Sequence, residues 1–222
     1  MCGIAGFCNL KKNLETESPY WKNILRNMHR SVAHRGGDAA GSYLWAHAGL
    51  AHARLSIRDI EGGAQPMVRT VEGREFAIVY NGEIYNTDEL EPELKEAGYH
   101  FETTSDTEVI LYAFIHYGPS FVTKLNGIFA FAIWDNSREK LFLYRDRVGV
   151  KPLFYTEEPG QVVFGSEPKA LFCHPDVTPE LDTDGLREVL AIGPARTMGN
   201  GIFKGMQEVL PGHFLCFSRW RI

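Results

Sequence analysis

The sequence lacks several features that would place it at once in a familiar class of protein. It has only four cysteines, Cys2, Cys8, Cys173 and Cys216, and because no two form a C-x-x-C pair the spacing typical of a zinc site is missing. No apolar run approaches the ~20 residues needed to span a bilayer. The N-terminus has no basic segment followed by an apolar core, as a secretory signal would. These absences predict a cytoplasmic protein with reduced thiols.

Charge of one sign is not concentrated in any segment either. The chain has 23 Lys and Arg residues against 28 Asp and Glu residues, for a net charge of −5, and no basic run or basic-aromatic stripe. This composition argues against a nucleic-acid-binding surface. Hydrophobic residues make up 44% of the 222 residues, which is enough for a large core. With no repeat and no evident linker, one domain over residues 1–222 is expected.

The sequence does contain many short apolar runs separated by turn residues. Asn81-Gly82 predicts a type I′ hairpin between strands at residues 76–80 and 84–85. Ser18-Pro19 predicts an N-cap at Ser18 and a first-turn proline for a helix that continues to Val32, and the capping-box sequence at residues 105–108 predicts another helix. Further strands are predicted at residues 3–10, 50–55, 127–134, 140–144, 152–156, 161–164 and 212–217. Further helices are predicted at residues 87–97, where Gly98 ends the helix, and at 167–172 and 184–190.

Several of these strands are apolar on both faces, as residues 128–133 show. Such strands need cover on both sides, from a second sheet on one face and from helices on the other. The pattern therefore predicts an α+β fold of stacked antiparallel sheets enclosed by helices.

Cys2 carries the most chemical information in the chain. Removal of Met1 would leave one residue that holds both a thiol and a free α-amino group. An α-amine has a pKa of about 7.7–8.0, so it can accept a proton near neutral pH and activate its own thiol as a nucleophile. Taken alone, the dipeptide is more simply interpreted as a buried cysteine on a first strand.

Five motifs in order change that balance. They are Met1-Cys2-Gly3-Ile4 and the segments at residues 80–86, 105–108, 125–131 and 145–153. Two further segments, Phe164-Gly165-Ser166-Glu167 and Leu210-Pro211-Gly212-His213, continue the pattern nearly to the C-terminus. Together they resemble the class II glutamine amidotransferase domain, and in particular the N-terminal glutaminase domain of glutamine-hydrolysing asparagine synthetase. The resemblance covers almost the whole chain. It implies an N-terminal-nucleophile hydrolase fold, a four-layer α/β/β/α sandwich.

The resemblance also implies an activity, the hydrolysis of glutamine to glutamate and ammonia through a Cys2 thioester. Asn81 and Gly82 match the oxyanion hole of the family, although Asn-Gly is also an ordinary turn sequence. Arg54 matches the residue that binds the substrate carboxylate, and its planar guanidinium suits that role. Asp106 matches the partner of the substrate ammonium, with Glu83 assisting. Alone, Arg54 and Asp106 would more simply be surface ion-pair residues, and Asp106 a first-turn helix acid.

Two features depart from the family pattern. Gly37 stands where the family usually has proline in His-Arg-Gly-Pro-Asp, so the loop is expected to be more mobile and no catalytic role is assigned to Arg35. No Ser-Gly-Gly-x-Asp-Ser phosphate-binding loop is found, so we expect the synthetase domain, with its ATP and Mg²⁺, to be absent from this chain. His34, His47 and His52 show no metal spacing and are interpreted as structural, and neither a metal nor a cofactor is expected in this domain.

Three functional alternatives remain open from the sequence. The ammonia would go to a synthetase domain or subunit that makes asparagine from aspartate and ATP. It could instead go to a different acceptor, such as a sugar phosphate or a phosphoribosyl donor. In a third alternative, of another class, the chain binds glutamine through Arg54 and Asp106 without turning it over. Whether the chain forms a homodimer is also left open.

Overall fold

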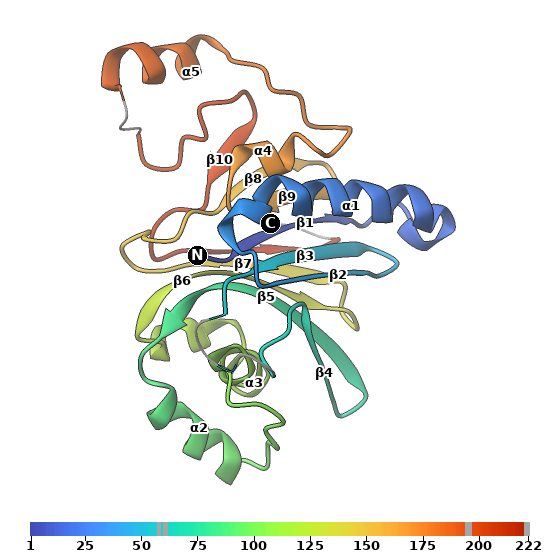
Figure 1. The fold of residues 1–222 in the computed structure, drawn as a ribbon, viewed down its shortest axis with the longest axis vertical. Coiled ribbons are helices and arrows are strands. Elements are labelled where there is room, and N and C mark those ends of the chain that lie inside the picture. Colours follow the sequence, from blue (N-terminus) through green and yellow to red (C-terminus); the bar gives the residue numbers. More distant parts are fainter. Residues whose placement is uncertain (57–58, 60–61, 194–196, 220–222) are drawn as a thin grey trace.

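Two antiparallel sheets stacked face to face form the centre of the computed structural model, which describes residues 1–56, 59, 62–193 and 197–219 (Figure 1). The first sheet has the strand order β10 (Met206–Glu208), β8 (Phe154–Glu158), β9 (Gln161–Gly165), β1 (Gly3–Asn9), β3 (Ala48–Arg54) and β2 (Ala39–Leu44). The second has the order β11 (Phe214–Phe217), β7 (Lys140–Arg145), β6 (Gly127–Asp135), β5 (Arg74–Ile84) and β4 (Met67–Val71).

Helices cover the outer face of each sheet and complete four layers (Figure 1). The first sheet is covered by α1 (Ser18–Val32) and the short α4 (Pro168–Leu171), and the second by α2 (Thr87–Glu96) and α3 (Asp106–Tyr117). The segment of α5 (Thr183–Arg187) and the π-helical η4 (Glu188–Ile192) lies apart from these layers, beyond β10. Short 3-10 turns precede α1, follow it and follow α3: η1 (Leu14–Glu17), η2 (Ala33–Arg35) and η3 (Pro119–Lys124).

Alternation along β5 shows how one strand supports two cores. Ala77 and Val79 point between the sheets, where they pack with Trp134 of β6, and Phe76 and Ile78 point to the opposite face toward α3. All five side chains are at most 2% exposed. Full burial of a large apolar side chain contributes about 1.5–3 kcal/mol, so the two-sided apolar strands are what hold the layers together.

The predicted hairpin at Asn81-Gly82 is wrong. Both residues lie inside the continuous strand β5, where Asn81 is opposite Ala130 and Gly82 is opposite Phe129. Neither has a positive φ, as a type I′ turn would require. Gly82 is needed for a different reason: a Cβ there would lie 2.4 Å from the Ile128 carbonyl oxygen. Long-range pairing with β6 therefore overrides the local turn signal.

Of the two N-caps predicted from the sequence, one is confirmed and one is wrong. Ser105 caps α3 as predicted, since its side chain accepts a hydrogen bond from Thr107 N at 3.2 Å. Ser18 was predicted as a cap but is the first residue of α1, which begins after Glu17, with Pro19 in the first turn. Strands β2, β4 and β10 were not predicted from the sequence, because they are short or largely exposed and carry no continuous apolar run.

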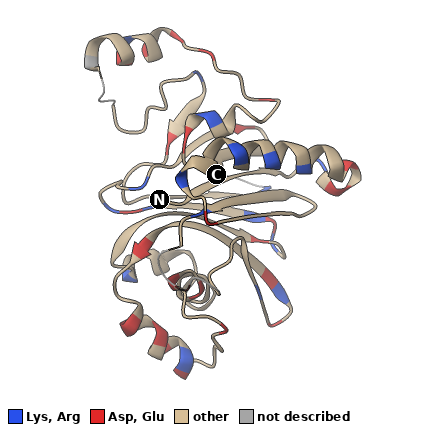
Figure 2. Cartoon of the chain, in the orientation of Figure 1, with Lys and Arg blue, Asp and Glu red and all other residues tan. Residues whose placement is uncertain are grey.

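Charged residues are spread over the outer layers. Figure 2 shows several Lys and Arg residues on α1 and several Asp and Glu residues on α2, at opposite sides of the stacked sheets. In the part of the chain that the structure describes, no helix is long and apolar enough to cross a membrane.

Candidate active site

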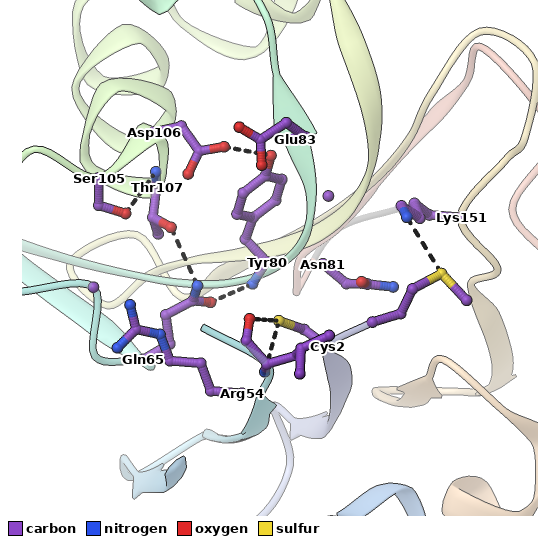
Figure 3. A pocket seen from close by; sticks show the side chains of 14 residues that line it. Cys2, Arg54, Gln65, Tyr80, Asn81, Glu83, Ser105, Asp106, Thr107 and Lys151 are labelled. Carbon is purple, nitrogen blue, oxygen red and sulfur yellow. Dashed lines mark hydrogen bonds between the residues drawn. The ribbon is translucent and has the colours of Figure 1, made fainter. Parts of the chain in front are cut away.

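The N-terminal residues Met1 and Cys2 line a pocket where both sheets and α3 meet (Figure 3). β1 brings Cys2 there, the end of β3 brings Arg54, β5 brings residues 80–83, and the first turn of α3 brings Asp106. The structure thus gathers all six residues that the sequence analysis singled out. The lining consists of Met1, Cys2, Arg54, Leu55, Gly63, Gln65, Tyr80, Asn81, Gly82, Glu83, Ser105, Asp106, Thr107 and Lys151.

The Cys2 thiol is held by backbone groups. Its Sγ lies 3.4 Å from Leu55 N and 3.5 Å from Leu55 O, so the sulfur accepts one hydrogen bond and donates another. The Cys2 carbonyl oxygen accepts a hydrogen bond of 3.0 Å from Arg35 Nε, and Arg35 Nη1 pairs with Glu167 Oε1 at 2.7 Å. Both the thiol and the backbone of Cys2 are therefore fixed by neighbouring segments.

Asn81 has an unused donor in this pocket. The residue is 1% exposed, and its Nδ2 is buried without a hydrogen-bond partner among the described residues. An unsatisfied buried N–H group costs about 1–3 kcal/mol, so such a group calls for an explanation. Asn81 lines the same pocket as Cys2, where a ligand oxygen could accept this hydrogen bond.

The alternation of backbone groups along β5 determines which edge of the strand the Gly82 N–H faces. Tyr80 N donates to Gln65 Oε1 at 2.6 Å and Ile84 N donates to Asp106 Oδ2 at 3.2 Å. Because alternate residues of a strand present their N–H groups to the same side, Gly82 N–H points to this edge as well. β4 no longer pairs with β5 here, since its last partner residue is Ile78. The Gly82 donor thus lies on the open edge of β5, beside Asn81.

An acidic group faces the opposite end of the pocket. Asp106 is 6% exposed, and its Oδ2 accepts a hydrogen bond of 2.8 Å from the Tyr80 hydroxyl as well as that from Ile84 N. Burial raises the pKa of Tyr80 well above its usual value, and the negative charges of Asp106 and Glu83 raise it further. Tyr80 therefore stays protonated and remains a donor to Asp106.

Arg54 supplies a cationic group to the same pocket. It is 7% exposed at the end of β3, and its Nη2 donates to the Asp59 carbonyl oxygen. Gly63 lies so close that a Cβ there would be 2.3 Å from Arg54 Nη2. Glycine at position 63 therefore leaves the room that the guanidinium occupies.

Two further residues of the pocket were not singled out from the sequence. Gln65 joins two walls, since its Oε1 accepts from Tyr80 N and its Nε2 donates to Thr107 Oγ1 at 3.1 Å. Lys151 is 9% exposed, and its Nζ lies 3.3 Å from Met1 Sδ. The motif at residues 145–153 contains Lys151 and could have indicated it, whereas nothing around Gln65 in the sequence marks it.

The three histidines near the site in sequence have local partners. His52 Nε2 lies 3.0 Å from the Tyr80 carbonyl oxygen, and burial lowers the pKa of His52 to about 4. His34 Nε2 lies 3.0 Å from Glu167 Oε1, and His47 Nδ1 lies 3.1 Å from Asn9 O. These contacts agree with structural roles. Among the described residues, no three His, Cys, Asp or Glu side chains are grouped so as to hold a metal ion.

A cysteine at position 2, facing a polar pocket between two stacked antiparallel sheets with helices outside, is the arrangement of the N-terminal-nucleophile hydrolases. The sequence matches the glutamine amidotransferase domain family over residues 1–222, and the chain belongs to that family, in its class II branch.

Relatives and solved structures agree with this assignment. The chain is 48% identical to Asparagine synthetase [glutamine-hydrolyzing] 3 of Bacillus subtilis over 99% of its own length and 35% of that protein. It is 37% identical to Asparagine synthetase [glutamine-hydrolyzing] 2 of the same organism, over 97% of this chain and 28% of that protein. The chain therefore spans about a third of these relatives.

The fold also matches a solved structure, glutamine phosphoribosylpyrophosphate amidotransferase from B. subtilis, with a TM-score of 0.67 and 19% identity over 98% of this chain and 47% of that one. This match confirms the predicted N-terminal-nucleophile hydrolase fold.

Proposed function

We propose that this chain hydrolyses the side-chain amide of L-glutamine to glutamate and ammonia, with Cys2 as the nucleophile. The observation that carries the proposal is the partnerless Asn81 Nδ2, buried in the pocket that also holds the Cys2 thiol. A buried donor beside a nucleophile suits the oxygen of an amide under attack, because that oxygen becomes negative in the transition state. Membership of the glutamine amidotransferase family supports glutamine as the amide.

The reaction proceeds in two steps at one carbon. With Met1 removed, the Cys2 α-amine accepts the thiol proton as Sγ bonds to the amide carbon. Asn81 Nδ2 and Gly82 N–H donate to the resulting oxyanion. The C–N bond then breaks, the α-ammonium returns its proton to the leaving nitrogen, and ammonia departs from a thioester. Water then attacks the thioester carbon, which releases glutamate and restores the thiol.

Charges in the pocket select glutamine over other amides. Arg54 binds the α-carboxylate, since a guanidinium can donate two parallel hydrogen bonds to it. Asp106 binds the α-ammonium, with Glu83 beside it on β5. The hydrogen bonds from Tyr80 and Ile84 fix the Asp106 carboxylate and so fix the distance of the ammonium from Cys2.

The ammonia would serve asparagine synthesis from aspartate and ATP, on a cytoplasmic synthetase domain or subunit. The support is the identity to two proteins named glutamine-hydrolysing asparagine synthetases, of which this chain corresponds to about a third. ATP and Mg²⁺ belong to that other domain, and the glutaminase steps above use only side chains and backbone of this chain.

Glutamate release from glutamine tests the proposal. Purified protein is first checked by mass spectrometry for loss of Met1, and glutamate is then measured for the native chain, Cys2→Ala and Cys173→Ala. Native protein and Cys173→Ala should release glutamate at equal rates, because Cys173 lies outside the pocket, and Cys2→Ala should be inactive. Equal rates for native protein and Cys2→Ala would contradict the mechanism. Glutamine binding by calorimetry without turnover would instead identify an idle glutamine-binding module.

A further inference from the structure

Lys151 is a nearly buried cation that the glutaminase steps above do not use. The residue is 9% exposed and lines the same pocket as Cys2. Within the described residues its ammonium forms no ion pair, and its one hydrogen-bond contact is that of 3.3 Å between Nζ and Met1 Sδ. A charge held away from water without a partner is costly, so its place in a catalytic pocket calls for a functional reason.

The backbone of Lys151 is fixed at the wall of the pocket. Its N–H donates to Asp146 Oδ2 at 3.0 Å, and its carbonyl oxygen accepts from Arg145 Nε at 3.0 Å. Asp146 is 1% exposed, and its Oδ2 also accepts from Phe129 N at 3.2 Å, which ties the loop to β6. The Lys151 side chain therefore extends from a rigid support toward the N-terminal residues.

The contact with Met1 shows which group this ammonium faces. The Met1 side chain and the peptide bond to Cys2 are short, so Lys151 Nζ lies within about 10 Å of the Cys2 nitrogen. That nitrogen becomes the α-amine once Met1 is removed, as the proposed function requires. Removal of Met1 also takes away the sulfur that Lys151 contacts. In the catalytic form, an unpaired cation thus faces the amine that has to act as a base.

Two arginines also lie near the N-terminal residues, but both make polar contacts with other segments. Arg35 Nε donates to the Cys2 carbonyl oxygen at 3.0 Å, while its Nη1 pairs with Glu167 at 2.7 Å, which offsets its charge. Arg54 Nη2 donates to a backbone carbonyl oxygen, and the proposed function uses its guanidinium for the substrate carboxylate. Lys151 has neither a carboxylate partner in the described chain nor a role in binding glutamine.

The acidic groups of the pocket do not pair with Lys151. Asp106 accepts a hydrogen bond of 2.8 Å from the Tyr80 hydroxyl, and Glu83 lies at this same end of the Tyr80 side chain (Figure 3). Neither carboxylate forms an ion pair with the Lys151 ammonium. In the proposed function both acids face the α-ammonium of the substrate. The end of the pocket near the chain terminus therefore keeps a positive charge of its own.

We propose that the positive charge of Lys151 keeps the Cys2 α-amine free of its proton near neutral pH, an inference that rests on the proposed glutaminase function. Two ammonium groups at this distance repel each other, and an α-amine binds its proton less tightly than a lysine side chain does. The α-amine therefore releases its proton first. The neutral amine then accepts the thiol proton, and Lys151 keeps its own proton throughout. Lys151 acts through the amine and is a positioning residue rather than a catalytic one.

The pH profile of kcat/KM for glutamine tests this role, because it reports protonation of the free enzyme. Lys151→Met removes the charge but keeps the length of the side chain. Its acid limb should move to higher pH by about 0.3–1.2 units, as Coulomb's law gives at about 10 Å for an effective dielectric constant between about 80 and 20. At pH values below the limb, kcat/KM should fall by about 2- to 15-fold, with little change well above it. Lys151→Arg keeps the charge and should overlay the native profile.

A control variant and a second readout accompany these profiles. Lys140→Met is the matched control, because Lys140 is a half-buried lysine at the opposite end of β7 from this loop and outside the Cys2 pocket. Its profile should equal that of native protein. The rate at which iodoacetamide alkylates Cys2, identified by mass spectrometry of the N-terminal peptide, should show the same shift in Lys151→Met without requiring turnover. Circular dichroism checks folding, and Lys151→Gln replaces Lys151→Met if the latter unfolds.

Three outcomes would overturn the role of Lys151. One is an acid limb at the same pH in native protein and the neutral variant, in both readouts. Another is an equal loss of rate at every pH, which would mean that Lys151 only supports the structure. The third is an equal shift in Lys151→Arg, because shape rather than charge would then matter. Native protein that is alkylated at Cys2 but hydrolyses no glutamine would instead contradict the glutaminase function, and the alkylation profile would still test Lys151.

Discussion

At the scale of single residues, Asn81 gives the sharpest expectation. Asn81→Ala removes the buried, partnerless Nδ2 without breaking any hydrogen bond it makes in the structure. Loss of one oxyanion donor typically lowers kcat by ~10²–10³ with little change in KM. Steady-state glutaminase kinetics checks this, with Asn126→Ala at an exposed position as the control. An unchanged kcat, or a change in KM alone, would contradict the proposed role of Asn81 as an oxyanion-hole donor.

Glu167 predicts a pH dependence of stability. Burial alone would raise its pKa, but hydrogen bonds from Arg35, Lys169 and His34 outweigh burial and lower it from 4.5 to about 2. A carboxyl group with a lowered folded-state pKa stabilises the fold above its unfolded pKa and loses that contribution as pH falls. Stability should therefore decrease from pH 4.5 toward pH 2, and Glu167→Gln should flatten that decrease. Urea unfolding midpoints measured across this range would show it, and identical slopes in both proteins would refute it.

At the scale of elements, the sequence correctly predicted those helix ends and strands that are determined by residues close to one another in the chain. The cap at Ser105, the helix end at Gly98 and the apolar strand at residues 128–133 all depend on neighbouring residues, and all three are present in the structure. Asn81-Gly82 was misassigned because its conformation is set by pairing with β6, about 50 residues away. Strand β2 was missed because it is held mainly by pairing with β3.

In the site, too, residues within sequence motifs were predicted, whereas a residue defined by long-range contacts was missed. Cys2, Arg54, Asn81, Gly82, Glu83 and Asp106 were identified through motifs, and the structure gathers them in one pocket. Gln65 was missed because its role exists only once β5 and α3 lie side by side. No periodicity or spacing reports such a contact.

The loop around Gly37 gives a second element-scale expectation. Gly36 has extended backbone angles, φ −157° and ψ 108°, which suit a residue before proline. A Cβ at Gly37 would meet no atom within 4 Å, and the Gly37 N–H makes no hydrogen bond in the described chain. Gly37→Pro should therefore raise the free energy of unfolding by about 0.4–1 kcal/mol, through the unfolded state. Chemical denaturation measures this, and a destabilised variant would show that position 37 needs a glycine.

At the scale of the whole molecule, His52 ties the two sheets together. It lies on β3 of the first sheet, and its Nε2–H donates to the Tyr80 carbonyl of the second. Burial lowers the pKa of His52 from 6.5 to about 4, so the unfolded chain takes up the proton first as pH falls. This contribution to stability is complete above pH 6.5 and is lost toward pH 4, by up to about 3 kcal/mol.

A variant separates His52 from the other buried histidine. His52→Gln keeps a donor for Tyr80 and should weaken the loss of stability between pH 6.5 and 4. It should not abolish that loss, because burial also lowers the pKa of His174 to about 4. Thermal unfolding at several pH values measures the slope, and an unchanged slope would assign the dependence to His174 alone.

The open edge of β5 has a consequence for deuterium uptake. The amides of Tyr80 and Ile84 are bonded to side chains, and the amide of Gly82 between them points to the same edge. Gly82 should therefore exchange its amide proton faster than both neighbours on that edge, although most of β5 is buried. An electrophilic glutamine analogue that alkylates Cys2 would place its oxygen on this amide and slow the exchange, which NMR can follow at a single backbone position.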